Sequence, residues 1–186
     1  MKRILVMLAE GFEEIEALTV VDVLRRANVE CVTCSLKEKE IQGAHNILVT
    51  ADKSLEDNDL NTYDGIVLPG GMPGSVNLRD NIKVVELVKD YYAAGKLVAA
   101  ICAAPIVLAK AGIADGKILT SYPSFKDQLD NCIYIEQPVV VDQNIITSRG
   151  PATTLLFAFE ILKKLGYEEE AKELSEGMLV DYLMNK

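Results

Sequence analysis

The sequence predicts one α/β domain, residues 1–186, in which a doubly wound, mostly parallel sheet is covered by helices on both faces. Short β-branched apolar runs alternate with helical patterns along almost the whole chain, as they do in βαβ units. The length of 186 residues is typical of a single domain. Because the chain contains no linker, low-complexity tract or internal repeat, one core accounts for the whole sequence.

The first half of the chain contains three apolar runs that predict parallel strands. They span residues 3–9, 30–35 and 63–68. Apolar residues at helical spacing predict a helix over 15–27, with Asn28 as its stop signal. The segment 41–51 is rich in glycine and β-branched residues and predicts a hairpin outside the parallel order, and residues 69–74 predict a turn.

The second half continues the alternation. Helices are predicted over 82–94, from the turn at Cys102 to residue 111, around 124–129 and over 153–165. Strands are predicted from residue 97 to the Cys102 turn and over 117–120, 138–141 and 145–148. The acidic run Glu168-Glu169-Glu170 lies in a further helical stretch and is interpreted as a solvated helix face.

Charge and hydropathy exclude several classes of function. The net charge of −9 argues against binding to a nucleic-acid backbone, which needs a basic face. The longest apolar runs are too short to span a bilayer. Glutamates follow the first apolar run where a signal peptide would carry small uncharged residues, so we expect a cytoplasmic protein without membrane contact.

Cys31 and Cys34 form a C-x-x-C pair that could suggest a redox or zinc site. They lie in a strand-like run, where positions i and i+3 point to opposite faces of the sheet. A redox pair of the thioredoxin kind would instead open a helix, and Cys102 and Cys132 do not supply a second closely spaced pair for zinc. Both residues are therefore interpreted as structural, reduced cysteines.

Cys102 ends a buried strand at the point where a helix restarts. A thiol at the amino end of a helix faces backbone N–H groups and the helix dipole, which favour thiolate and predict a lowered pKa for Cys102. The same strand-to-helix turn presents the nucleophile of many hydrolases. The alternative is a buried structural cysteine, since free cysteine is among the most buried residue types. The local pattern leaves both open.

Two further loops are expected to meet Cys102, because ligands of doubly wound sheets bind at the carboxyl ends of the strands. Glu16 follows the first strand, and a buried carboxyl that stays protonated can hydrogen-bond a thiol and tune its pKa. Gly70 and Gly71 follow the third, and their N–H groups with that of Ala103 would form an oxyanion pocket. A double glycine is also compatible with a plain tight turn.

The sequence contains one histidine, His45, in the predicted hairpin. A Cys-His-acid triad must use His45 or not exist, and a lone loop histidine is usually a solvated surface residue. One histidine also argues against a transition-metal site. Arg149, between a strand and the last predicted helix, either binds an anionic substrate group or holds backbone carbonyls.

Four motifs occur in the order that one known family shows, and the resemblance covers residues 2–165. They are Glu13-Glu14-Ile15-Glu16, Val67-Leu68-Pro69-Gly70-Gly71, Ala99-Ala100-Ile101-Cys102-Ala103 and Thr147-Ser148-Arg149-Gly150-Pro151. Together they closely resemble the ThiJ/PfpI superfamily, nearest its branch of Parkinson-associated deglycases. The resemblance implies a flavodoxin-like homodimer with a cofactor-free and metal-free site. It also implies that Cys102 is the reactive, oxidation-sensitive cysteine, Glu16 the protonated glutamate, and Gly71 and Ala103 the oxyanion donors.

The chain departs from this pattern at two positions. Tyr122 stands where many members of the branch have a histidine, and His45 stands where some have an arginine. An imidazole base is therefore missing from its usual place, and Glu16 would have to move protons. Ala103 follows the cysteine where the protease-like branch has histidine, which argues against peptidase activity.

Two functions are expected from these residues. The first is a glyoxalase-like or deglycase-like enzyme of stress defence, which acts through Cys102 on methylglyoxal or early glycation adducts of proteins, with Gly70, Tyr122, Arg149 and His45 around the substrate. The alternative is a non-enzymatic oxidative-stress sensor or redox-regulated chaperone, in which the same cysteine is oxidised.

Overall fold

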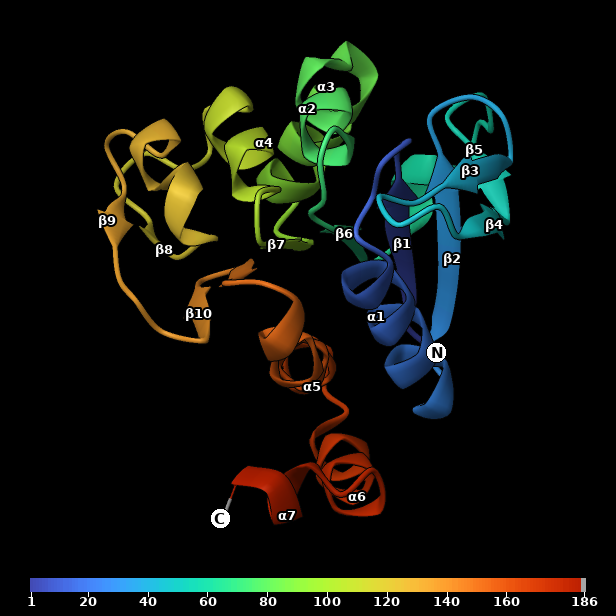
Figure 1. Ribbon diagram of the computed structural model, residues 1–186, viewed down its shortest axis with the longest axis vertical. Helices are drawn as coiled ribbons and strands as arrows, with labels where there is room; N and C mark the ends of the chain where they lie inside the picture. Colours follow the sequence, from blue (N-terminus) through green and yellow to red (C-terminus); the bar gives the residue numbers. More distant parts are fainter. Residues whose placement is uncertain (185–186) are drawn as a thin grey trace.

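The computed structural model describes residues 1–184 and contains a seven-stranded sheet between two layers of helices (Figure 1). The strands are β1 (Arg3–Leu8), β2 (Glu30–Ser35), β5 (Lys53–Ser54), β6 (Gly65–Leu68), β7 (Leu97–Ile101), β10 (Val139–Asp142) and β11 (Ile145–Ser148). Their order is β10-β11-β7-β6-β1-β2-β5, and every neighbouring pair is parallel except β10 and β11. The predicted doubly wound α/β fold is confirmed.

Helices cover both faces of this sheet. One face carries α1 (Glu14–Arg26) and α5 (Thr154–Lys164), and the other carries α2 (Gly74–Asp80), α3 (Ile82–Ala93) and α4 (Pro105–Lys110). Helices α6 (Glu168–Gly177) and α7 (Val180–Met184) extend beyond α5 (Figure 1). Short 3-10 turns occupy Leu60–Thr62, Pro123–Gln128 and Pro151–Thr153. Strands β3 (Glu40–Gln42) and β4 (Leu48–Thr50) form the predicted hairpin.

Strand β1 shows why the core has two halves. Alternate side chains of a strand point to opposite faces, so Ile4 and Val6 pack with α1 and α5, while Leu5 and Met7 pack with α3 and α4. The cysteine pair of β2 follows the same rule. Cys31 lies in the first half of the core and Cys34 in the second, and both are free and buried, which confirms their interpretation as structural.

The structure differs from the prediction at two segments and adds the short strands β5 and β9, which the sequence did not predict. The turn predicted over 69–74 gives way to α2 at Gly74, and Asn81 then ends α2 and accepts the N–H groups of Lys83 and Val84 to begin α3. The strand predicted over 117–120 is β8 (Ile118–Leu119), which pairs with β9 (Ile133–Tyr134) outside the main sheet.

Side chains of the sheet explain the position of β8. The N–H of Ile118 donates to Asp142, and the N–H of Thr120 donates to Thr147. These bonds dock the strand onto side chains of β10 and β11, so it cannot pair with their backbones. The segment that contains β8 and β9, called the arm of β8 and β9 below, therefore lies against β10 and β11 at one edge of the sheet.

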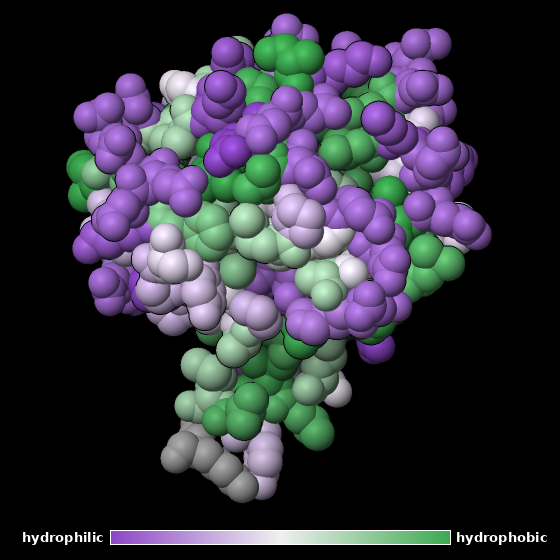
Figure 2. All heavy atoms as spheres, turned by 45° about the horizontal axis from the view of Figure 1, so that its top comes forward, coloured by the Kyte–Doolittle hydropathy of each residue, from purple (hydrophilic) through white to green (hydrophobic). Residues whose placement is uncertain are grey.

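No helix within residues 1–184 is long and apolar enough to cross a membrane. Exposed apolar side chains instead gather at the C-terminal end, where Leu179, Leu183 and Met184 are all largely exposed. Figure 2 shows this apolar surface on the protruding lower part of the molecule, next to the grey terminal residues. The upper part of the same view is mostly hydrophilic.

Candidate active site

Cys102 lies on the sharp turn that its sequence predicts. Its backbone has a φ of +62°, a left-handed conformation that is uncommon outside glycine and is typical of strained functional turns. The Cys102 N–H donates to the carbonyl of Ser148 at the end of β11, at 2.9 Å. The chain thus leaves the sheet at Cys102, with the backbone of this residue tied to the end of β11 and its side chain next to Gly70, which follows β6.

Glu16 reaches the same point from α1. Its side chain is fully buried, and its Oε2 accepts the N–H of Gly70 at 2.7 Å. A Cβ atom added at Gly70 would lie 2.5 Å from Glu16 Oε2 and 2.6 Å from Cys102 Cβ. Glycine at position 70 therefore permits the close approach of the carboxyl to the cysteine, and its N–H is already committed to Glu16.

The Glu16 carboxyl is held in a protonatable state. Burial raises its pKa to about 7, against the lowering effect of Cys102 and the Gly70 N–H, and the charge of Glu13 raises it further. Glu16 Oε1 is buried and has no hydrogen-bond partner. The sulfur of Cys102 lies close enough to change the pKa of Glu16. The expectation of a buried, protonated carboxyl beside the thiol agrees with this geometry.

The prediction of a lowered pKa for Cys102 is wrong in its net direction. Burial and then the charge of an ionised Glu16 raise the pKa of the thiol, while the N–H groups of Ala103 and Gly71 lower it. The prediction included the effect of the helix amino end on the pKa but not the larger effect of burying the thiol. A proton on Glu16 removes the opposing charge, so thiolate at Cys102 is favoured only while Glu16 holds a proton.

Gly71 locks the loop after β6 onto the loop after β1. Its φ is +90°, and an added Cβ atom would collide with the backbone N of Glu13. The Glu13 N–H in turn donates to the Gly70 carbonyl at 2.9 Å. This close backbone packing directs the Gly71 N–H toward the Cys102 sulfur, where the Ala103 N–H also acts. Both sequence-predicted oxyanion donors are therefore brought to the thiol.

His45 lies in the turn of the hairpin and is tied to the start of α1. Its Nδ1 is 2.8 Å from Glu14 Oε2 and 3.7 Å from Glu13 Oε2, and its backbone N–H donates to Glu14 Oε1. The ring is largely exposed. Hydrogen bonding to Glu14 raises the pKa of His45, which favours the protonated imidazole, and the contact anchors the hairpin to the start of α1.

Sequence reasoning missed the role of Glu14. Burial raises the pKa of its carboxylate, but the hydrogen bond with the His45 ring, followed by those from the backbone N–H groups of His45 and Ile47, lowers it on balance. A Cβ atom at Gly43 would collide with this carboxylate, so the glycine is the signal that could have revealed the contact. Among residues 1–184, Glu13, Glu14 and His45 form the one group whose potential metal-ligand atoms lie within 4.8 Å of one another.

Tyr122 is joined to Cys102 through the backbone. Its N–H donates to the carbonyl of Cys102 at 2.9 Å, and its ring packs against Gly150. The arm of β8 and β9 supports it, because Tyr134 binds the neighbouring Ser121 carbonyl. The side chain of Tyr122 remains 46% exposed.

The guanidinium of Arg149 has a buried nitrogen without a hydrogen-bond partner. Its Nη1 is buried without a partner, and its side chain makes no hydrogen bond or ion pair within residues 1–184. The interpretation that Arg149 holds backbone carbonyls is therefore wrong. The alternative, an acceptor that comes from a bound anion, stays a prediction.

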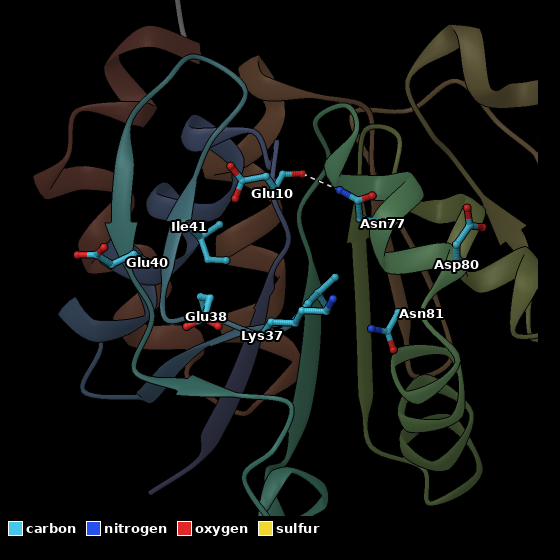
Figure 3. Close-up of a pocket in the computed structure, with 9 residues that line it drawn as sticks. Glu10, Lys37, Glu38, Glu40, Ile41, Asn77, Asp80 and Asn81 are labelled. Carbon is cyan, nitrogen blue, oxygen red and sulfur yellow. Dashed lines mark hydrogen bonds between the residues drawn. The ribbon is translucent and has the colours of Figure 1, made fainter.

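A groove of about 500 Å³ lies apart from Cys102, between the segment around β3 and helix α2. Figure 3 shows Glu10, Glu38 and Glu40 on one side and Asp80 with Asn81 on the other. None of the residues that approach the sulfur lines this groove.

The sequence is similar to those of known proteins. The model of the DJ-1/PfpI family matches residues 2–164. Protein dj-1beta of Drosophila melanogaster is 43% identical over 184 residues, which cover 97% of this chain and 98% of that protein. A protein named deglycase from Pyrococcus abyssi is 36% identical over 166 residues, or 88% of this chain and 99% of its own length.

Solved structures agree with the sequence comparison. The crystal structure of Drosophila melanogaster DJ-1beta superposes with a TM-score of 0.91 at 42% identity and covers 96% of this chain and 97% of its own. The structure named Toxoplasma gondii DJ-1, oxidized, superposes with a TM-score of 0.92 at 37% identity, over 96% and 98% of the two chains. The chain belongs to the DJ-1/PfpI family.

Proposed function

We propose that the protein is a cofactor-independent enzyme that converts methylglyoxal, or the early adduct of such an oxoaldehyde with a protein, into a hydroxy acid through Cys102. The observation that carries the proposal is the burial of a protonatable Glu16 carboxyl beside the Cys102 thiol, with Gly70 next to both. The name of the Pyrococcus abyssi relative supports the same class of reaction.

The first step forms a covalent adduct. The Cys102 thiolate attacks the aldehyde carbon, a C–S bond forms, and the carbonyl electron pair moves to oxygen. The N–H groups of Gly71 and Ala103 stabilise that developing charge, and Glu16 gives its proton to the oxygen. The product is a hemithioacetal beside an ionised Glu16.

The second step moves a proton within the adduct. The Glu16 carboxylate takes the proton from the former aldehyde carbon and returns it to the neighbouring carbon, while the proton of the hemithioacetal hydroxyl passes to the ketone oxygen. This shift gives a thioester, which water hydrolyses to the hydroxy acid while the C–S bond breaks and the thiol is restored. Substrate and water supply every atom, so no redox cofactor is needed.

An assay of D,L-lactate formation from methylglyoxal tests the proposal. Wild type should exceed the spontaneous rate, Cys102→Ser should fall to that rate, and Glu16→Gln should lose at least about a hundredfold in kcat, as expected for a general acid–base. A wild-type rate equal to the spontaneous background would contradict the enzyme. Turnover that survives in Glu16→Gln would contradict the proton transfer alone.

A second candidate function uses Cys102 as a redox sensor or as the switch of a chaperone. The thiol is only partly buried, and a related structure from Toxoplasma gondii is named as oxidized. Thiolate is the form that peroxide oxidises to sulfenic and sulfinic acid. Peroxide treatment with mass spectrometry separates the candidates: sulfinic acid at Cys102 in a protein without methylglyoxal turnover would favour the sensor.

A homodimer and a reducing, cytoplasmic environment complete the proposal. The exposed apolar side chains of Leu179, Leu183 and Met184 offer a surface that a second copy could cover. The four free cysteines fit a compartment that keeps thiols reduced. Analytical ultracentrifugation tests the dimer, and a monomer at micromolar concentration would contradict it.

A further inference from the structure

Tyr122 contacts Cys102 through the backbone, and its ring lies at the end of β11. Its own N–H binds the Cys102 carbonyl, so the two residues are neighbours through the backbone. The Cys102 N–H binds Ser148, two residues before the Gly150 against which the ring packs. The phenol ring therefore packs on the segment that follows β11, which is itself hydrogen-bonded to the residue that carries the sulfur.

This ring is held in place and yet is free to meet a ligand. A Cβ atom at Gly150 would lie 3.3 Å from Tyr122 Cδ2, closer than ordinary van der Waals contact. Glycine at position 150 therefore lets the ring pack against the backbone. The Tyr122 hydroxyl makes no hydrogen bond within residues 1–184. The side chain is 46% exposed although an aromatic ring of this size usually buries its faces.

We infer that Tyr122 is a specificity-determining residue that makes the Cys102 site selective for carbonyl compounds with an aryl group. An aryl substituent on the dicarbonyl carbon next to the reacting aldehyde can stack on the exposed ring while the sulfur attacks. A methyl substituent gains little from the same contact. The inference rests on the proposed function and names the substrate class of that site.

Phenylglyoxal and methylglyoxal form the test pair, because both carry the same aldehyde beside a ketone. The ratio of their kcat/KM values is compared among variants, so that the intrinsic reactivity of each compound cancels. Relative to wild type, Tyr122→Phe should keep the ratio, and Tyr122→Leu should lower it about fivefold, the size of one aromatic pair contact. Tyr182→Leu, on α7 at the far end of the molecule, is the matched control and should leave the ratio unchanged.

A measurement that needs no turnover separates the aryl site at Tyr122 from the proposed enzymatic activity. Alkylation of Cys102 by N-phenyl iodoacetamide and by iodoacetamide compares an aryl with an unsubstituted reagent on the same sulfur. Wild type and Tyr122→Phe should show the same preference for the aryl reagent, and Tyr122→Leu should lose about fivefold of it. An unchanged ratio in Tyr122→Leu, in both assays, overturns the aryl site. Absence of all turnover with a lost alkylation preference overturns the enzyme but supports the aryl site.

Discussion

Glu16 Oε2 accepts the N–H of Gly70 at 2.7 Å, which fixes the carboxyl of α1 to the loop that follows β6. Because Gly70 also abuts Cys102, the hydrogen bond sets both the position of the carboxyl and its distance from the thiol. The other carboxyl oxygen, Oε1, is left without a partner. A buried carboxyl with one unsatisfied oxygen is stabilised by a proton, and this proton is the basis of the predictions that follow.

The first prediction concerns the pH dependence of stability. The pKa of Glu16 rises to about 7 in the folded protein, so the native state holds this proton more tightly than the unfolded chain does. The stabilisation is complete below the ordinary glutamate pKa and is lost as pH rises through about 7. Relative to Glu16→Gln, wild type should lose roughly 3 kcal/mol of unfolding free energy between pH 4.5 and pH 8. Urea unfolding of both proteins measures this difference.

Parallel pH profiles of wild type and Glu16→Gln would contradict this prediction. Ionisable groups that do not interact with Glu16, His45 included, contribute equally to both profiles and cancel in the difference. The comparison therefore reports the proton at Glu16 together with any change at Cys102, whose pKa depends on the charge of Glu16.

The second prediction concerns the hairpin anchor. Hydrogen bonding to Glu14 raises the pKa of His45, so Glu14→Gln should bring it down toward its ordinary value. Because the chain has one histidine, a single imidazole signal in an NMR titration reports the change. Glu40→Gln, an exposed acid on the same hairpin, serves as the control and should leave the pKa of His45 where it is. Equal values in Glu14→Gln and wild type would refute the anchor.

The third prediction compares two glycines with the same backbone angle. Gly71 has φ +90° in a crowded loop, and Gly166 has φ +89° with open space around its Cβ position. Gly166→Ala should cost about 1 kcal/mol, the penalty of the left-handed conformation alone. Gly71→Ala should cost more than about 3 kcal/mol, because the Glu13 backbone must move as well. Equal losses in thermal or urea unfolding would show that the loop contact is not tight.

Local patterns were sufficient to predict most of the fold. Strand β1 alternates between the two halves of the core, and the apolar spacing of α1 matches its buried face, so periodicity and topology rules identified them. Helix α2 was missed because a glycine-rich and proline-rich stretch precedes it and Asn81 ends it after seven residues. The position of β8 depends on side chains of β10 and β11 distant in sequence.

The site was predictable in its members but not in its electrostatics. The turn at Cys102 and the glycines after β6 have local signals, and the parallel topology brings them to Glu16. The contact of Glu14 with His45 joins residues 31 positions apart, and no local pattern encodes it. The net direction of the Cys102 pKa depends on burial and on the charge of Glu16 together, which only the packed structure supplies.

The central claim is that Cys102 becomes thiolate while Glu16 keeps its proton. Infrared spectroscopy of the protonated carboxyl band, assigned by its loss in Glu16→Gln, and thiolate ultraviolet absorbance, assigned by its loss in Cys102→Ser, can be followed in one pH titration. The proposed reaction requires both signals together around pH 7: a proton on Glu16 removes the charge that adds to the burial effect on the pKa of Cys102, and the N–H groups of Ala103 and Gly71 then oppose the burial. Loss of the carboxyl band through about pH 7 with no thiolate absorbance would contradict the claim, because Glu16 would then ionise while Cys102 stays a thiol.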